Sequence, residues 1–191
     1  MCALDRVKAS VGAELEVWDQ PSIAVGVIKD GKVELCEGFG YADVESGRKA
    51  DADTLYQIGS CSKAFTAAAA AVLVDQGKLD WDKPVIEYLP WIRFMDPFTT
   101  YHATTRDLLC HRTGLPRHDA YWIDGPCTRR GMVENLRNMQ PAWSFRSNWC
   151  YQNTCFVAVG MLIEALSGQT WEEFVRENLL EPIGMARTTF F

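Results

Sequence analysis

The chain has 191 residues and a net charge of -6, with 48% hydrophobic and 23% charged residues. This composition is typical of a soluble globular protein with one substantial core, and it excludes disordered, collagen-like and fibrous classes. The acidic balance gives no electrostatic reason to expect nucleic acid or an anionic membrane surface as a partner.

The N-terminus and the cysteines predict a cytoplasmic protein. Met1 leads directly into a short mixed sequence with charged residues, without the continuous apolar stretch of a secretory signal peptide. The most apolar run, residues 64–74, is shorter than the roughly 20 residues that a membrane-spanning helix needs. Seven cysteines without any Cys-x-x-Cys pair favour reduced thiols over a disulfide framework or a zinc site.

The first third of the chain predicts a helix followed by a β-hairpin. Apolar residues recur at helical spacing over residues 4–17, and Pro21 ends this pattern. Two β-rich runs follow, residues 22–29 and 32–39, and Asp30-Gly31 between them is a two-residue turn signal. A helix followed by an antiparallel hairpin is the start of an α+β sheet layer.

The rest of the chain predicts helices. The strongest signal covers residues 60–76, which include five consecutive alanines and precede Gly77 in the position of a left-handed cap. Small alanine side chains favour close packing on every side, as in a helix at a domain centre. Further helices are expected over residues 104–111 and 154–166. A last helix starts at Thr170, with the capping-box pattern, and ends before Pro182.

The start of the alanine-rich helix carries a candidate nucleophile, Ser60, and a candidate activator, Lys63. Three residues apart on a helix, both side chains project from one face. A serine hydroxyl needs a proton acceptor, and a lysine can serve only if burial or nearby positive charge lowers its pKa. The helix N-terminus supplies backbone N–H groups that would stabilise a developing oxyanion. Because Ser-x-x-Lys occurs by chance roughly once in such a chain, the surrounding sequence decides its meaning.

Three segments follow one another in an order that gives the pair its meaning. The first is YQIGSCSKAFT at residues 56–66, the second LLCHRTGLP at residues 108–116, and the third YQN at residues 151–153. Alone, the third is more typical of a turn with a satisfied amide. Together the segments resemble the nucleophile, L-L-x-H-x-(S/T)-G-L-P and Tyr-x-Asn motifs of the serine β-lactamase-related, penicillin-binding-protein-like family, the group of class C β-lactamases, D-alanyl peptidases and esterases.

The resemblance implies an α+β fold, an α/β sandwich with an antiparallel sheet plus a helical subdomain. Residues 1–191 would form a single incomplete domain of this type, with the helix and hairpin in residues 1–59 and the mainly helical part in residues 60–191. The family's third motif, Lys-(Thr/Ser)-Gly or His-x-Gly, does not follow the Tyr-x-Asn segment, so the C-terminal strands are expected to be missing.

The resemblance also implies roles for four side chains. Ser60 would be acylated, Lys63 and Tyr151 would share the proton transfer, and Asn153 would donate its amide to a substrate carbonyl. Which of Lys63 and Tyr151 is the general base stays open, because coupled groups titrate as a unit. The substrate would be a small-molecule ester, amide or peptide, and the interpretation includes no cofactor and no metal ion.

Three interpretations of the chain as a whole remain. It is part of a longer serine hydrolase, it is a truncated and catalytically impaired binding or regulatory module of the same fold, or a second chain completes its sheet. Without further strands, the hairpin would have an open edge and uncovered apolar surface.

The histidines and tryptophans offer alternative sites. Ser60, one of the three histidines (His102, His111 and His118) and either Asp107 or Asp119 form a Ser-His-Asp triad on paper. The chain has no Gly-x-Ser-x-Gly elbow and no His-Glu-x-x-His spacing, so we interpret His111 as a loop residue with structural hydrogen bonds. Trp122, Trp143 and Trp149 flank the motifs, where they would line an apolar pocket or pack in the core.

Overall fold

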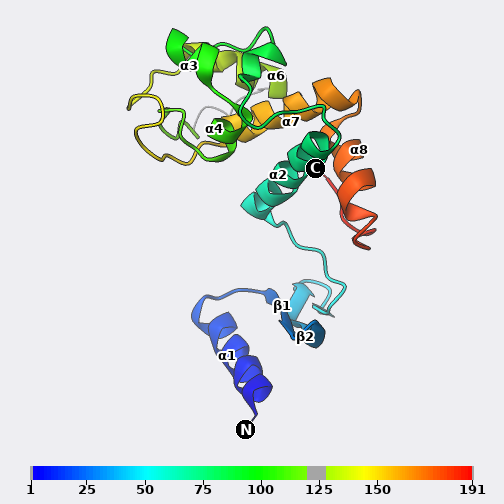
Figure 1. Cartoon of the computed structure of the whole chain (residues 1–191). Coiled ribbons are helices and arrows are strands. Elements are labelled where there is room, and N and C mark those ends of the chain that lie inside the picture. Colours follow the sequence, from blue (N-terminus) through cyan, green and yellow to red (C-terminus); the bar gives the residue numbers. More distant parts are fainter. Residues whose placement is uncertain (1, 120–127, 191) are drawn as a thin grey trace. The chain divides into compact units, whose positions relative to one another are not determined.

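A computed structural model of the chain describes residues 2–119 and 128–190. The chain divides into two compact units, Met1–Gln57 and Ile58–Phe191. The first holds a helix and the antiparallel sheet, and the second is built from helices (Figure 1). This α+β composition confirms the expected fold class, whereas the single-domain interpretation of residues 1–191 stays a prediction.

The first unit contains the predicted helix and hairpin. Its elements are α1 (Ala3–Val17), β1 (Ser22–Lys29), β2 (Lys32–Asp43) and β3 (Arg48–Lys49), and the strands form an antiparallel sheet in the order β1-β2-β3. Asp30 and Gly31 both have positive φ, 49° and 74°, as a tight two-residue hairpin turn requires. Strand β2 runs four residues beyond the predicted end, and β3 was not predicted.

The first unit buries few apolar side chains. Among its described residues, Leu35 and Ala50 are the hydrophobic side chains that reach the buried class. Ile28 and Val33, beside the hairpin turn, are 73% and 68% exposed. This agrees with the uncovered apolar surface expected of the hairpin.

The second unit contains the other predicted helices and several shorter ones. Its elements are η1 (Gly59–Cys61), α2 (Ser62–Asp75), η2 (Val85–Glu87), α3 (Pro97–His102), α4 (Thr105–Leu109), α6 (Arg129–Glu134), η3 (Asn135–Asn138), α7 (Asn153–Ser167), α8 (Trp171–Val175) and the π-helical turn η4 (Arg176–Leu180). Gly77 has the predicted positive φ of 68°, and Thr170 forms the predicted capping box with Glu173. No helix in the described part of the chain is long and apolar enough to cross a membrane.

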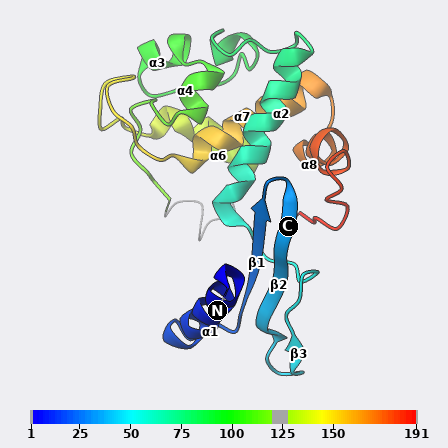
Figure 2. The ribbon, with the colours of Figure 1, turned by 60° about the horizontal axis from the view of Figure 1, so that its bottom comes forward.

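Helix α7 lies at the centre of the second unit's core, and α2 packs against it (Figure 2). Leu162 and Ile163 of α7 are fully buried, as is Leu73 of α2. The prediction that the alanine-rich helix packs on every side is wrong. Its buried residues (Thr66, Ala69, Ala70 and Leu73) lie along one face, while Ala64 is exposed. The alanines therefore allow a close approach to α7 on that one face, which sets the position of the residues at the start of α2.

Candidate active site

Ser60 lies in η1, and Lys63 lies in the first turn of α2. Lys63 Nζ donates a hydrogen bond to Ser60 Oγ over 3.1 Å, so the two side chains share one face as predicted. Gly59, just before the serine, has a φ of 50°, a left-handed conformation that glycine adopts without steric cost. The chain can thus turn sharply into the helix and present the hydroxyl at its start.

Tyr151 reaches the same hydroxyl from a segment 91 residues further along the chain. Its Oη donates to Ser60 Oγ over 2.6 Å. The Lys63 ammonium lies 4.6 Å from the centre of the tyrosine ring. Partial burial acts to raise the pKa of Tyr151, but hydrogen bonds with Lys63 and Ser60 and the charges of Lys63 and Arg117 outweigh it. The pKa of this phenol is therefore below its ordinary value of 10.

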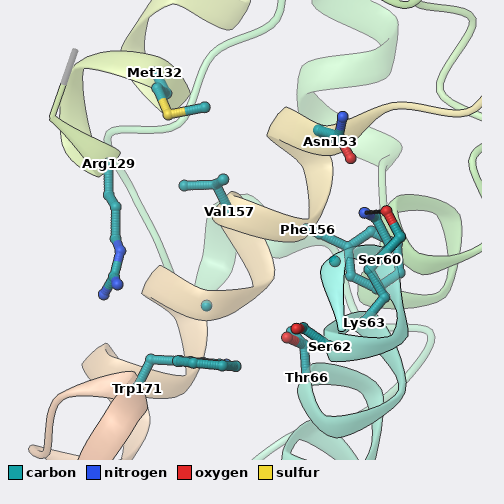
Figure 3. A pocket seen from close by; sticks show the side chains of 12 residues that line it. Ser60, Ser62, Lys63, Thr66, Arg129, Met132, Asn153, Phe156, Val157 and Trp171 are labelled. Carbon is teal, nitrogen blue, oxygen red and sulfur yellow. Dashed lines mark hydrogen bonds between the residues drawn. The ribbon is translucent and has the colours of Figure 1, made fainter. Parts of the chain in front are cut away.

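Asn153 begins α7, two residues after Tyr151. Its Nδ2 donates to Asp119 Oδ1 over 2.9 Å, and Asp119 also forms an ion pair with Arg117. A side-chain amide nitrogen carries two hydrogens, so one bond to Asp119 leaves a second hydrogen for a substrate oxygen. Figure 3 places Asn153 near Ser60 and Lys63 at one end of a cavity.

The histidine of the LLCHRTGLP segment supports the Tyr-x-Asn segment. The Gln152 backbone N–H donates to His111 Nδ1 over 3.1 Å, which is the structural role expected of this histidine. The imidazole lies against the Tyr151 and Phe156 rings, with centroids 4.6 and 5.2 Å away. Burial lowers the pKa of His111, and the charge of Lys63 lowers it further, so the ring stays neutral and able to accept this bond.

Asp107, one of the two carboxylates considered for a triad, forms structural hydrogen bonds instead. It is fully buried and accepts hydrogen bonds from Arg112 Nε at 2.5 Å and from Arg146 Nε and Nη2 at 2.9 and 2.8 Å. Burial acts to raise the pKa of Asp107, but bonds from Arg146, Thr104 and Arg112 outweigh it and lower the pKa to about 2. The carboxylate thus fixes the loop that leads to Tyr151.

The triad alternative finds no support in the described residues, 2–119 and 128–190. There, Ser60 Oγ is joined to Lys63 and Tyr151, and no hydrogen bond links it to a histidine. His102 is stacked on Phe98, with its Nδ1 2.8 Å from the Phe98 carbonyl oxygen.

The tryptophan that lines the cavity is not one of the three that the sequence suggested. Trp143 and Trp149 are 39% and 64% exposed and are not among the residues that line the cavity, and Trp122 lies outside the described residues. Trp171 of α8 lines the cavity instead. Sequence reasoning missed it, although its position directly after the predicted cap Thr170 placed it in the first helical turn.

The cavity has a volume of about 430 Å³ and lies within the second unit (Figure 3). Its walls come from η1 and α2 on one side and from α6, α7 and α8 on the others. The lining residues are Gly59, Ser60, Ser62, Lys63, Thr66, Arg129, Met132, Asn153, Phe156, Val157, Gly160 and Trp171. A candidate nucleophile at the end of such a cavity can reach a small molecule bound inside it.

The family model named Beta-lactamase matches residues 13–191. The chain belongs to the Beta-lactamase family. An unguisins hydrolase from Aspergillus campestris is 35% identical over 188 residues, which cover 91% of this chain and 34% of that protein. A second unguisins hydrolase, from Aspergillus violaceofuscus, is 32% identical over 188 residues, which cover 91% of this chain and 32% of that protein.

Solved structures of the family show the same fold. An octameric penicillin-binding protein homologue from Pyrococcus abyssi matches with a TM-score of 0.89 and 30% identity, covering 100% of this chain and 45% of that one. A D-amino acid amidase from Ochrobactrum anthropi, complexed with L-phenylalanine amide, matches with a TM-score of 0.81 and 23% identity, covering 100% of this chain and 55% of that one. The chain therefore spans about a third of the length of these two curated relatives and about half of the length of these two solved structures.

Proposed function

We propose that this member of the Beta-lactamase family is a serine hydrolase that forms an acyl-enzyme at Ser60 from a small-molecule ester or amide. The observation that carries the proposal is the convergence on Ser60 Oγ of Lys63 Nζ, at 3.1 Å, and Tyr151 Oη, at 2.6 Å. A hydroxyl held between two titratable groups has a direct route for its proton, which is what an activated serine requires.

The first step is attack of Ser60 Oγ on the substrate carbonyl carbon. As the new C–O bond forms, the hydroxyl proton passes to the pair of Lys63 and Tyr151, and the carbonyl oxygen becomes an oxyanion. Both groups donate to Ser60 in the resting arrangement, so one of them must first lose a proton. The lowered pKa of Tyr151 favours its phenolate next to the Lys63 ammonium.

The tetrahedral intermediate then collapses and the leaving group takes the proton back from the pair. The product is an ester between the acyl group and Ser60, and attack by water on this ester regenerates the hydroxyl. Asn153 has a free amide hydrogen beside the serine and would orient the carbonyl group of the substrate. Positioning of this kind converts a bimolecular reaction into an effectively unimolecular one.

The relatives' names support a hydrolase. One matched protein is named an unguisins hydrolase and another a D-amino acid amidase, although the likeness to the second concerns the fold alone. We therefore include an aromatic amino acid amide among the substrates to be tested. Completion of the sheet by a second chain stays a prediction.

Intact-mass spectrometry after treatment with a fluorophosphonate and with an activated ester tests this function. We expect one adduct on the native chain, absent from Ser60→Ala and kept in Ser10→Ala, in which an exposed serine of α1 is replaced. An acyl adduct from the activated ester that is never hydrolysed would support the impaired binding or regulatory module. The absence of an adduct on the folded native chain would overturn the proposed function.

A further inference from the structure

The cavity extends well beyond the groups that transfer protons. Four residues of α7, spaced as one helical face, line it: Asn153, Phe156, Val157 and Gly160. Asn153 lies at the end with Ser60 (Figure 3). Gly160 lies two turns further along α7, next to the indole of Trp171. The proposed chemistry uses only the Ser60 end, so the far end is available to bind part of a substrate.

Gly160 keeps the far end open. A Cβ added to it would meet Trp171 Cδ1 at 3.7 Å, an ordinary van der Waals distance, and no other atom within 4 Å among the described residues outside its own stretch of helix. The interior of a helix disfavours glycine, because glycine loses the most backbone entropy there. Without a side chain, Gly160 leaves open the space in front of the indole, which a side chain larger than that of alanine would occupy.

The Trp171 indole, at the far end of the cavity, is fixed in place by contacts with other residues. The Trp171 backbone N–H donates to Glu164 Oε1 over 3.2 Å, and the Phe190 ring packs against the indole in a T-shaped arrangement with centroids 5.4 Å apart. Its Nε1 is buried, and the residues that the structure describes give it no hydrogen-bond partner. The ring is thus a fixed apolar wall of the cavity.

At the far end of the cavity, the positive charge of Arg129 is neutralised by carboxylates of the protein. Arg129 of α6 pairs with Glu172, with Nη1 3.1 Å from Oε2, and lies 3.5 Å from Glu164. Next to it, Met132 and Val157 present apolar side chains to the cavity. The Lys63 ammonium at the Ser60 end disfavours a cationic ligand. An uncharged hydrocarbon group therefore fits this lining best.

We propose that the cavity is the pocket for the acyl group, and that it selects substrates with a long aliphatic or an aromatic group on the scissile carbonyl. The inference rests on the proposed function, because the acyl group is the part that stays bonded to Ser60 Oγ when the leaving group departs. A volume of about 430 Å³ lies in the usual range of small-molecule sites. Gly160 and Trp171 determine the size of the group, and neither takes part in proton transfer.

Acylation by p-nitrophenyl esters of acetate, hexanoate and phenylacetate tests the pocket. In each reaction the Ser60 Oγ–acyl bond forms as the bond to p-nitrophenolate breaks, so the burst of p-nitrophenolate reports the rate. We expect hexanoyl and phenylacetyl transfer to exceed acetyl transfer by about tenfold or more, as expected for several buried methylene groups. In Gly160→Leu this ratio should fall about tenfold. In Ala165→Leu, on the exposed side of the same helix, it should not change.

The possible outcomes separate the two proposals. Circular dichroism establishes folding, and if Gly160→Leu does not fold, Gly160→Ala should lower the ratio to a smaller extent, because its Cβ fits at 3.7 Å. Acylation of Ser60 with no preference for the larger groups, or with a ratio that a folded Gly160 variant leaves unchanged, would overturn the pocket alone. If no ester labels Ser60, the proposed function fails, and the acyl pocket fails with it.

Discussion

The two units of this chain differ in how they are stabilised. In the helical unit, α2 and α7 bury leucine, isoleucine and alanine side chains on their facing sides, and every proposed catalytic residue lies at or within two residues of the start of one of these helices. In the helix-and-hairpin unit, α1 has no buried residue and the apolar side chains beside the hairpin turn are exposed. Local sequence signals specified both units, but only the helical unit combines them with a substantial core that can hold a site in place.

Removing the Tyr151 hydroxyl should have the largest effect on the rate of Ser60 acylation. This variant tests whether the helical unit carries the chemistry. Tyr151→Phe keeps the ring against His111, so the fold should persist while the rate of Ser60 acylation falls by about 10²- to 10⁴-fold. Stopped-flow measurement of p-nitrophenolate release gives the rate. Tyr101→Phe, at an exposed tyrosine of α3, should leave it unchanged. A fall of less than about threefold in Tyr151→Phe would assign the proton transfer to Lys63 alone.

A matched pair of leucine substitutions tests the difference in packing directly. Leu162 is fully buried in α7, whereas Leu55 in the first unit is 58% exposed. Leu162→Ala should lower the free energy of unfolding by about 2–5 kcal/mol, because it leaves a cavity in the core, and Leu55→Ala by about 0.5 kcal/mol or less. Urea denaturation followed by circular dichroism measures both. Equal losses in the free energy of unfolding would contradict the proposed difference in packing between the two units.

Local features of the fold were predictable from short signals in the sequence. The Asp30-Gly31 turn and the Thr170 capping box each depend on a few neighbouring residues, and both are present. Helix α3 begins with an Asp96 cap and Pro97, but six residues are too short for a periodic apolar pattern. The burial of α2 along one face could not be predicted, because alanine has the same size and polarity on every face and only the partner helix distinguishes them.

The candidate site, like the fold, could be predicted from the sequence only in part. Ser60, Lys63, Tyr151 and Asn153 were proposed from motifs, and the structure brings the first three within hydrogen-bonding distance, although their roles remain proposals. Gly160 and Trp171 belong to no motif, since they meet only because α8 folds back onto α7. Residues that bind through packing between helices are not visible in a linear pattern.

Acid should weaken the helical unit through Asp107. The pKa of this carboxyl is about 2 in the folded chain and near 3.9 when unfolded, so the folded state favours the charged form. The stabilisation is complete above pH 3.9 and is lost as the pH falls toward 2, which amounts to about 2 kcal/mol. Urea midpoints between pH 5 and pH 2 measure the loss. Asp107→Asn should show a flatter dependence over this range, because it has no carboxyl group to protonate.

Replacing His111 should have the smallest effect on acylation, about tenfold, and it tests whether this residue acts by positioning Tyr151. His111→Phe keeps a ring against Tyr151 and Phe156 but removes the Nδ1 acceptor of the buried Gln152 N–H. Tyr151 is joined to Gln152 by the peptide bond, so loss of this anchor should misplace its hydroxyl relative to Ser60.

The pH dependence of acylation separates positioning by His111 from simple support of the fold. The folded pKa of His111 is lowered, so its neutral form contributes stability in full above the ordinary value of 6.5 and loses it as the pH falls through the folded value. The groups facing the ring are the Lys63 ammonium, the Tyr151 phenol and the rings of Trp149 and Phe156. Protonation places a hydrogen on Nδ1, where the Gln152 N–H now binds. Acylation by the native chain should therefore show an additional decline as the pH falls through this lowered folded value, and His111→Phe should lack that additional decline because its anchor is already absent. An unchanged acid decline in the folded variant would assign it to another group and leave His111 a purely structural role.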